Sequence, residues 1–449
     1  MMKVLKTVCL LLALPAVLAA DELAVTVYNS NLGVVSETRT LPFERGVNRL
    51  AFRDVPSLID ASSVRFEVEG AGQQVTILEQ NYAYDLVSPD QLYAKYVDKE
   101  IELIDKEGRL YSGTLLAFSG GAVTLQEPSG RIKIVRMEHV TEANFPTLPE
   151  GLITRPTLFW LYNSSIGGER ECLVSYQTSG LTWTAEYVGV LSSDEKQLGL
   201  SGWSSINNTS GKTYADATLK LVAGDIHRAL PQYPPMRAEK LMAAGMEAKG
   251  FEEKAFFEYH LYTLPRKATV ADKEIKQISL FEPATTGVEK VFLYRPERSA
   301  RKVEVALKFT NSAAAGLGLP LPAGRVRLFK ADDDGFLVLL GEDRIDHTPK
   351  DEELNLQVGY AFDIAVEERL MDQTRVSPKV EERTYEIELR NRKSESVTVK
   401  VEKKLYGFWE IVESSHTYTK KDATTLVFEV PVEADEKVVV RFRVRFTQA

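Results

Sequence analysis

Apolar residues alternate with polar residues along most of the chain, and this period of two limits its possible folds more than any other feature. In a β-strand successive side chains point to opposite faces, so the alternation places apolar groups on one face of a sheet and charged groups on the other. Many short strands separated by turn residues are typical of β-sandwiches. We therefore predict an all-β fold made of β-sandwich domains. The clearest alternating runs are 385–389, 397–401 and 438–446.

The first twenty residues have the layout of a secretory signal peptide. Two lysines precede an apolar run at 8–14, which is too short to span a bilayer as a permanent helix. Small residues follow, and cleavage is expected after Ala19 or Ala20. We predict that residues 1–20 are removed and that the protein is exported to the periplasm or the extracellular space. No transmembrane span is expected after signal cleavage.

The charge of the chain limits its partners. The formal net charge is −9 at pH 7, and removal of Lys3 and Lys6 with the leader makes it two units more negative. An acidic surface argues against nucleic acid and against anionic lipid as main partners. Cys9 also leaves with the leader, so Cys172 stands alone and no internal disulfide is expected. Cys172 lies in a strand-like run, which favours a buried thiol over a nucleophile.

Changes in pattern along the chain predict its organisation. Between residues 90 and 145 the runs become very short and are separated by Glu107-Gly108, Gly120-Gly121 and Ser129-Gly130, pairs that suit tight hairpins. This pattern predicts a small barrel of the SH3 or Sm-like kind, inserted as a structural element. The predicted order is a signal peptide at 1–20, an N-terminal β segment at 21–89, the small β-barrel insertion at 90–145, a β-sandwich part at 146–229, a mobile linker at 230–255 and a C-terminal β-sandwich part at 256–449.

The linker has two interpretations. Three prolines, at 231, 234 and 235, lead into a segment rich in Ala, Met, Glu and Lys that lacks the period of two. The first interpretation is a mobile loop or linker. The second is a docked amphipathic helix that buries Met236, Met242 and Met246, which fall near helical spacing.

No local motif for catalysis is present in the sequence. There is no Gly-x-Ser-x-Gly elbow, no paired-histidine zinc helix and no phosphate-binding glycine loop. No two histidines are close in sequence, so a metal site would have to be assembled from distant strands. We therefore assign no catalytic, cofactor-binding or metal residue and expect no cofactor. The histidines are His139, His227, His260, His347 and His416.

One acidic turn resembles the start of a calcium-binding loop. Asp332 and Asp334 followed by Gly335 could direct carboxylate oxygens at one ion. The twelfth position of such a loop holds Asp343 in place of the usual glutamate. Apolar runs flank the turn on both sides, and Asp-Gly is a common hairpin tip. We expect a solvated hairpin turn.

Several motifs in the second half of the chain resemble a known family. They are Trp183 with Tyr187, Asn208 with Gly211 and Tyr214, the run 219–224, and Leu321-Pro322-Ala323-Gly324. In this order they are similar to the uncharacterised bacterial exported domain that forms the C-terminal part of mucoidy-inhibitor-like proteins. The resemblance covers residues 157–446 and implies export, but it implies no catalytic residues. Longer members have a coiled coil where this chain has the small-barrel segment.

Two classes of function follow from the sequence. The first is an exported, non-enzymatic β-sandwich protein of the bacterial cell envelope that binds an envelope protein or a cell-surface polymer. The alternative is a periplasmic hydrolase or metal-dependent enzyme, with a site assembled from distant Asp, Glu and His residues. A cleft that gathers such residues would favour the enzyme. A smooth sandwich with an exposed aromatic patch would favour the binding protein.

Overall fold

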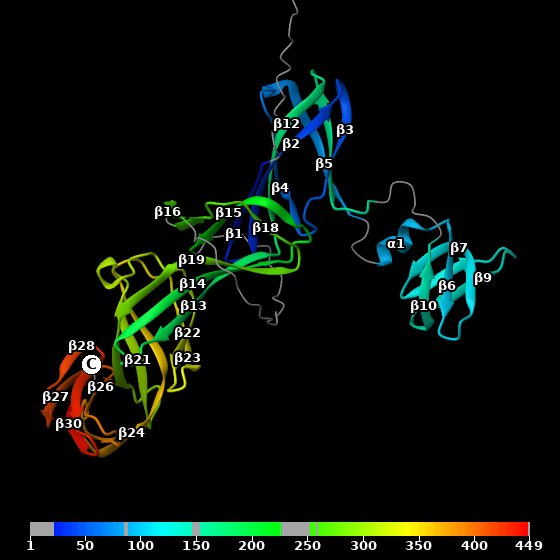
Figure 1. Cartoon of the computed structure of the whole chain (residues 1–449). Coiled ribbons are helices and arrows are strands. Elements are labelled where there is room, and N and C mark those ends of the chain that lie inside the picture. The colour runs from blue at the N-terminus through cyan, green and yellow to red at the C-terminus, as the bar shows by residue number, and fades with distance from the viewer. Residues whose placement is uncertain are drawn as a thin grey trace, which may run out of the picture.

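The computed structural model describes residues 22–84, 89–145, 153–224, 226, 252–256 and 259–447. Nearly all of this part is β-strand, arranged in five sheets around three hydrophobic cores (Figure 1). The predicted all-β class is confirmed. No helix in the described ranges is both long and apolar enough to cross a bilayer. The predicted signal peptide lies outside the described residues, as do His227, Met236, Met242 and Met246.

Three sheets contribute most of the buried residues of the first and largest core. The eight-stranded sheet contains, in order, β16 (Glu252–Phe256), β17 (Tyr259–Thr263), β15 (Tyr214–Ala223), β1 (Leu23–Tyr28), β2 (Leu32–Phe43), β12 (Gly168–Thr178) and β4 (Ile59–Val68), and β18 (Ala268–Val270) pairs with β15. The three-stranded sheet contains β3 (Gly46–Arg53), β11 (Thr157–Ser164) and β5 (Val75–Ala83). The five-stranded sheet contains β19 (Glu274–Gly287), β14 (Gln197–Asn208), β13 (Leu181–Leu191), β22 (Gly324–Ala331) and β23 (Leu337–Ile345).

Aromatic side chains join these three sheets. The ring of Trp160 on β11 lies 4.5 Å from that of Phe66 on β4, so the three-stranded sheet packs on the eight-stranded one. Trp183 on β13 lies 6.2 Å from Tyr262 on β17, which joins the five-stranded sheet to the same core. Burial of such large rings dominates the stability of a core. The segments predicted as separate, 21–89 and 146–229, therefore contribute to one core.

The chain on either side of the predicted linker belongs to one sheet. β15 ends at Ala223, and β17 returns antiparallel beside it, with Val222 opposite Leu261. β16 begins at Glu252, so the last residues of the predicted 230–255 linker lie in a strand. β16 pairs with β17 along its full length, and this pairing satisfies backbone groups that a linker would leave to water.

The segment predicted as a small barrel forms a module of its own, inserted between β5 and β11. Helix α1 (Pro89–Lys95) stacks Tyr93 against Phe118 with ring centres 4.5 Å apart, and β10 and β9 end the hydrogen-bonded order of the sheet without closing it. The insertion and its short strands agree with the expectation, but the sheet is open. Its strands are β10 (Val140–Asn144), β6 (Glu100–Asp105), β7 (Leu110–Ser119), β8 (Ala122–Gln126) and β9 (Ile132–Arg136), with the short helix η2 (Met137–His139) between β9 and β10.

A single nine-stranded sheet builds the third core by curling over its own apolar face. Val399 near one end of the strand order and Phe442 near the other belong to the same buried cluster. The long strand β24 contributes Leu356 to the first core and Ile364 to this one. The predicted 256–449 part therefore contains two cores. The strands are β27 (Phe408–Ser414), β30 (Lys437–Thr447), β25 (Val380–Asn391), β24 (Glu353–Ser377), β21 (Lys302–Thr310), β20 (Glu289–Tyr294), β26 (Val397–Lys404), β29 (Thr425–Val432) and β28 (Thr419–Asp422).

Candidate functional site

The aromatic motifs of the sequence hold strands together. Trp183 is buried, and its Nε1 donates a hydrogen bond of 3.0 Å to the carbonyl of Val222. The hydroxyl of Tyr187 donates at 2.7 Å to the carbonyl of Pro322, in the motif that precedes β22. A buried ring whose polar atom has a protein partner stabilises a core without exposing a group to a ligand. These residues therefore connect the sheets of the first core.

The motif at 208–214 also has a structural role. Asn208 is fully buried, and its Nδ2 donates to the carbonyls of Lys212, Val270 and Ala271. Its Oδ1 accepts from the backbone N–H and the hydroxyl of Ser210. One side chain thus satisfies the backbone where β14 turns toward β15, a requirement for any buried turn.

The acidic turn is a hairpin, as expected. Oδ1 of Asp332 accepts the backbone N–H of Asp334 at 3.1 Å and that of Phe336 at 2.9 Å. Gly335 has a φ of 84°, a left-handed conformation that glycine adopts without strain. An aspartate that bonds its own turn in this way is a common hairpin cap.

The cysteine and the histidines do not form a reactive group in the described part of the chain. Cys172 is fully buried, and burial raises the pKa of its thiol to about 12, helped by the nearby charge of Glu171. A thiol with so high a pKa stays protonated at neutral pH and is a poor nucleophile. Nδ1 of His347 accepts the backbone N–H of Ala323, and Nδ1 of His416 bonds the hydroxyl of Ser415. Across the described ranges, no three His, Cys, Asp or Glu side chains lie where they could hold a metal ion.

A cluster of buried charges lies inside the first core. Glu37 on β2 has an exposed fraction of only 5 %. Its Oε1 accepts from Lys212 Nζ at 2.6 Å and from the hydroxyl of Tyr176, and its Oε2 accepts from Nε of Arg39 at 3.0 Å. Figure 1 shows β2 beside β12, the strand that supplies Tyr176. The side chains of Lys212, Tyr176 and Arg39 all donate hydrogen bonds to the carboxylate of Glu37.

The charges of this cluster stabilise one another. Burial opposes the ionisation of Glu37, but Lys212 and Arg39 beside it hold the pKa of the carboxyl below its ordinary value. Burial lowers the pKa of Lys212, and burial together with the charge of Glu37 raises the pKa of Tyr176 well above its ordinary range. Perturbed pKa values occur at active sites, but structural ion-pair networks produce them as well. Because the carboxylate faces three donors, the arrangement fixes a buried charge and provides no free acid or base.

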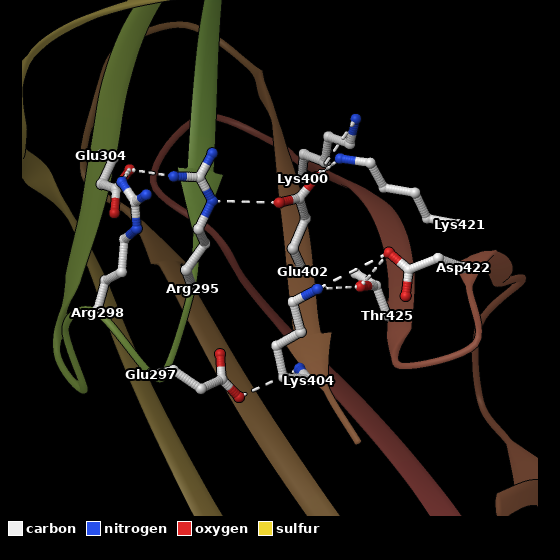
Figure 2. Close-up of polar contacts among 10 residues, drawn as sticks. All are labelled: Arg295, Glu297, Arg298, Glu304, Lys400, Glu402, Lys404, Lys421, Asp422 and Thr425. Atoms are coloured by element: carbon white, nitrogen blue, oxygen red, sulfur yellow. Dashed lines mark hydrogen bonds and ion pairs between the residues drawn. The ribbon is translucent and has the colours of Figure 1, made fainter. Parts of the chain in front are cut away.

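A second group of charges lies on the nine-stranded sheet (Figure 2). Arg295 lies between two carboxylates, with Nη1 3.0 Å from Oε2 of Glu304 and Nε 3.1 Å from Oε2 of Glu402. Glu402 also pairs with Lys421 at 3.0 Å. Both carboxylates have a cationic partner, so opposite charges offset each other across β20, β21, β26 and β28. We call this group of paired charges the outer band. Neither Glu304 nor Glu402 is therefore free to bind a ligand.

The candidate site is a cleft at the open side of the first core. β4 pairs only with β12 and β5 pairs only with β11, so one edge of each strand has no partner strand within the described residues. A cleft of about 1190 Å³ lies where these two edges come together. An unpaired edge presents backbone N–H and C=O groups that another strand can bond. The cleft therefore offers main-chain groups on both of its sides.

A polar link holds the cleft in shape at one end. Nε2 of Gln80 on β5 donates at 2.6 Å to the carbonyl of Ala61 on β4, while its Oε1 accepts from Nε1 of Trp160 at 2.7 Å. The edges of β4 and β5 are thus linked near Ala61, and the cleft lies at the other end of the two strands, where the connection 69–74 between Val68 and Val75 also lines it. The position of the cleft therefore follows from how β4 and β5 are placed relative to each other.

The cleft has an apolar lining. Phe66 and Val68 of β4 and Val75 and Ile77 of β5 line it, and all four remain only half-buried although they pack against the first core. Leu173 of β12 lines it too, with 41 % of its surface exposed. Grouped apolar side chains that stay partly open to water mark a contact surface when polar residues surround them.

Unpaired acidic side chains lie beside this lining. Glu69 is exposed and Glu171 is half-buried, and the backbone N–H of Glu69 bonds the carbonyl of Glu171 at 2.9 Å. Neither carboxylate has a Lys or Arg partner in the described part of the chain, whereas Glu67 pairs with Arg65. The cleft thus combines free strand edges, an apolar lining and uncompensated negative charge.

The sequence reasoning missed both the buried charges and the cleft. A signal existed for the first, since Glu37 occupies the same face of β2 as Val35 and Leu41, which are both buried. A charge at an inward position of an alternating strand predicts a buried partner. For the cleft no local signal existed, because it depends on which strands end each sheet. Searches against protein-family models and against curated proteins found no match for this chain.

Proposed function

We propose that this protein is exported and binds an extended segment of another polypeptide in the cleft between β4 and β5. The observation that carries the proposal is the pair of free strand edges that border an apolar, acidic cleft. Strand addition uses the main chain for affinity and alternate side chains for specificity. The leader-like layout of residues 1–20 supports export, and an envelope protein is then the natural partner.

A polypeptide fits this site better than a surface polysaccharide does. The edges of β4 and β5 repeat an N–H and a C=O at the spacing of a strand, and only another peptide backbone repeats the complementary groups at that spacing. Alternate side chains of the added strand would contact Phe66 and Ile77. The intervening side chains would lie beside Glu69 and Glu171, so Lys or Arg is favoured there.

A direct test uses a defined peptide. A fluorescent six-residue peptide of alternating Val and Lys is titrated with the mature protein, and binding is measured by anisotropy. We expect saturable binding to the wild type and at least about tenfold weaker binding to Glu69→Lys/Glu171→Lys, since that factor corresponds to about 1.4 kcal/mol. A second peptide, with Glu in place of Lys, is titrated with the wild type. It should bind as weakly as the Val-Lys peptide binds to the double variant.

A matched control changes two carboxylates away from the cleft. Glu100 and Glu142 are exposed on the inserted module, so Glu100→Lys/Glu142→Lys makes the same change in net charge. This control should bind the Val-Lys peptide like the wild type. Equal binding by the cleft variant and the wild type, or no binding by either, would contradict the proposal.

A further inference from the structure

The inserted module carries a strand, β9, whose outer edge pairs with no other strand that the structure describes. β9 ends the strand order of its sheet and pairs only with β8 among the described residues. Its five residues pair with β8 without any irregularity of register, from Ile132 opposite Gln126 to Arg136 opposite Ala122. Edge strands are commonly protected by a bulge, a proline, a short length or a charged side chain. This edge has no bulge and no proline, although it is only five residues long and carries Lys133.

On β9, Ile132, Ile134 and Arg136 share one face, and Lys133 shares the other face with the buried Val135. Ile132 and Ile134 lie on one face by the period of two and are 65 % and 69 % exposed. Lys133 lies between them, with Arg131 and Arg136 at either end. These three cations are exposed and contact Glu127 or Glu138 at 3.3–3.6 Å, and Nζ of Lys133 also lies 4.4 Å from the ring centre of Tyr111. Such exposed pairs are weak and are readily exchanged for a partner's charge.

The strand and the cleft are complementary in three respects. Both have free backbone edges, the two exposed isoleucines match an apolar lining, and the basic residues match the unpaired Glu69 and Glu171. We infer that the strand taken up by the cleft is β9 of a second copy of this protein. This inference rests on the proposed function of the cleft and names its partner.

The attachment of the module favours a second copy over the same chain. The module leaves the body after β5 at the Ala83 end, and the cleft lies at the Val75 end of the same strand. Eight residues of strand span roughly 26 Å. The connection from Tyr84 to Pro89 has five peptide steps, which reach at most about 18 Å. β9 of the same chain would have to fold back along the whole of β5, whereas a second copy meets no such restraint.

A contact of this kind joins copies head to tail. The cleft and β9 are different surfaces, so each copy offers one of each and the interface is heterologous. Unless a ring closes, every added copy leaves one free cleft and one free β9, and assemblies grow with concentration. The same feature allows a complementation test, because each surface can be disabled alone.

The experiment is sedimentation velocity of the mature protein over a series of concentrations. We expect the wild type to form species larger than a dimer as the concentration rises. Ile132→Glu/Ile134→Glu disables β9 and Glu69→Lys/Glu171→Lys disables the cleft, so each variant alone should stay a monomer. An equimolar mixture should form a dimer and nothing larger, because one intact cleft meets one intact β9.

A matched control changes other exposed apolar strand residues. Leu337 and Leu339 are 56 % and 51 % exposed on β23, so Leu337→Glu/Leu339→Glu should assemble like the wild type. A monomeric wild type at all concentrations, or a mixture of the two variants that forms no dimer, overturns the inference. If the Val-Lys peptide still binds the monomeric wild type, the proposed function of the cleft stands and only the partner is wrong. If that peptide binds only after Ile132→Glu/Ile134→Glu, the occupant is the module of the same chain.

Discussion

The first core and the nine-stranded sheet use charge in opposite ways. In the first core Glu37 and Lys212 are both less than 10 % exposed and bond each other inside the protein, while Glu69 and Glu171 beside a cleft have no Lys or Arg partner among the described residues. On the nine-stranded sheet the charges of Figure 2 pair across neighbouring strands, and they range from the buried Glu304 to the exposed Lys421. The difference shows that position alone does not indicate the role of a charge. A charge with satisfied partners supports the fold, whether buried or exposed, and an unpaired charge beside an apolar cleft can attract a partner of opposite charge.

The largest effect is expected from removing one partner of the buried pair. Lys212→Met leaves the carboxylate of Glu37 in the core with only part of its compensation. Breaking a buried ion pair costs about 3–5 kcal/mol of unfolding free energy. Urea unfolding measures the loss, and Glu37→Gln/Lys212→Met should recover part of it. A loss below about 1 kcal/mol for the single variant would mean that water reaches the pair and that the two regions do not differ in this respect.

The next effect follows from the lowered pKa of Glu37. The folded protein binds a proton at this carboxyl less readily than the unfolded chain, whose ordinary value is 4.5. The stabilisation is therefore complete above pH 4.5 and is lost as the pH falls through the lower folded pKa. We expect the unfolding free energy to decrease as the pH falls below the unfolded value of 4.5, and to decrease less steeply in Glu37→Gln. Equal slopes for both proteins would assign the acid sensitivity to other carboxyls.

The link that holds the cleft should have a smaller effect. Gln80→Ala leaves Nε1 of the buried Trp160 without its protein acceptor, which costs about 1–3 kcal/mol. Gln80→Glu keeps an acceptor for Trp160 but removes the donor to the carbonyl of Ala61. We expect thermal unfolding to show a larger loss for the alanine variant, and peptide binding to change in both. Unchanged binding in both variants would show that the shape of the cleft does not depend on this link.

A change in the outer band should be smaller still. Lys421 is 57 % exposed, and Glu402 keeps Arg295 when Lys421 is replaced by alanine. We expect Lys421→Ala to alter the unfolding free energy by less than about 1 kcal/mol. An effect as large as that of Lys212→Met would show that the band acts as one cooperative network, and the contrast between the two regions would fail.

No effect is expected from calcium. The acidic turn uses Asp332 to bond its own backbone, so the melting temperature should not change when calcium is added. A specific site would stabilise the fold by about 2.7 kcal/mol at a hundredfold excess over its dissociation constant. A rise that disappears in Asp334→Ala would identify a metal site in the turn.

The alternation of the sequence was sufficient for the fold class and for individual strands, because a period of two depends only on neighbouring residues. The runs at 385–389 and 438–446 became β25 and β30, which pair with Tyr385 opposite Phe442. The alternation could not provide the order of the strands in each sheet. That β1 pairs in parallel with β15, or that β4 ends a sheet, depends on contacts between distant segments. The cleft results from that order, so no single motif encodes it.

The inserted module has a consequence for how the protein tolerates change. Its two ends meet the body at β5 and β11, where Ala83 lies opposite Thr157, so they are anchored roughly 5 Å apart by a pair of hydrogen-bonded strands. The entropy lost in closing a loop between fixed ends grows only slowly with the length inserted. For the strands β5 and β11, the entropy cost of connecting their ends through the module is therefore close to the cost of connecting them through a hairpin turn. A mutation in the module can alter what it carries without disturbing the topology of the sheets that hold it.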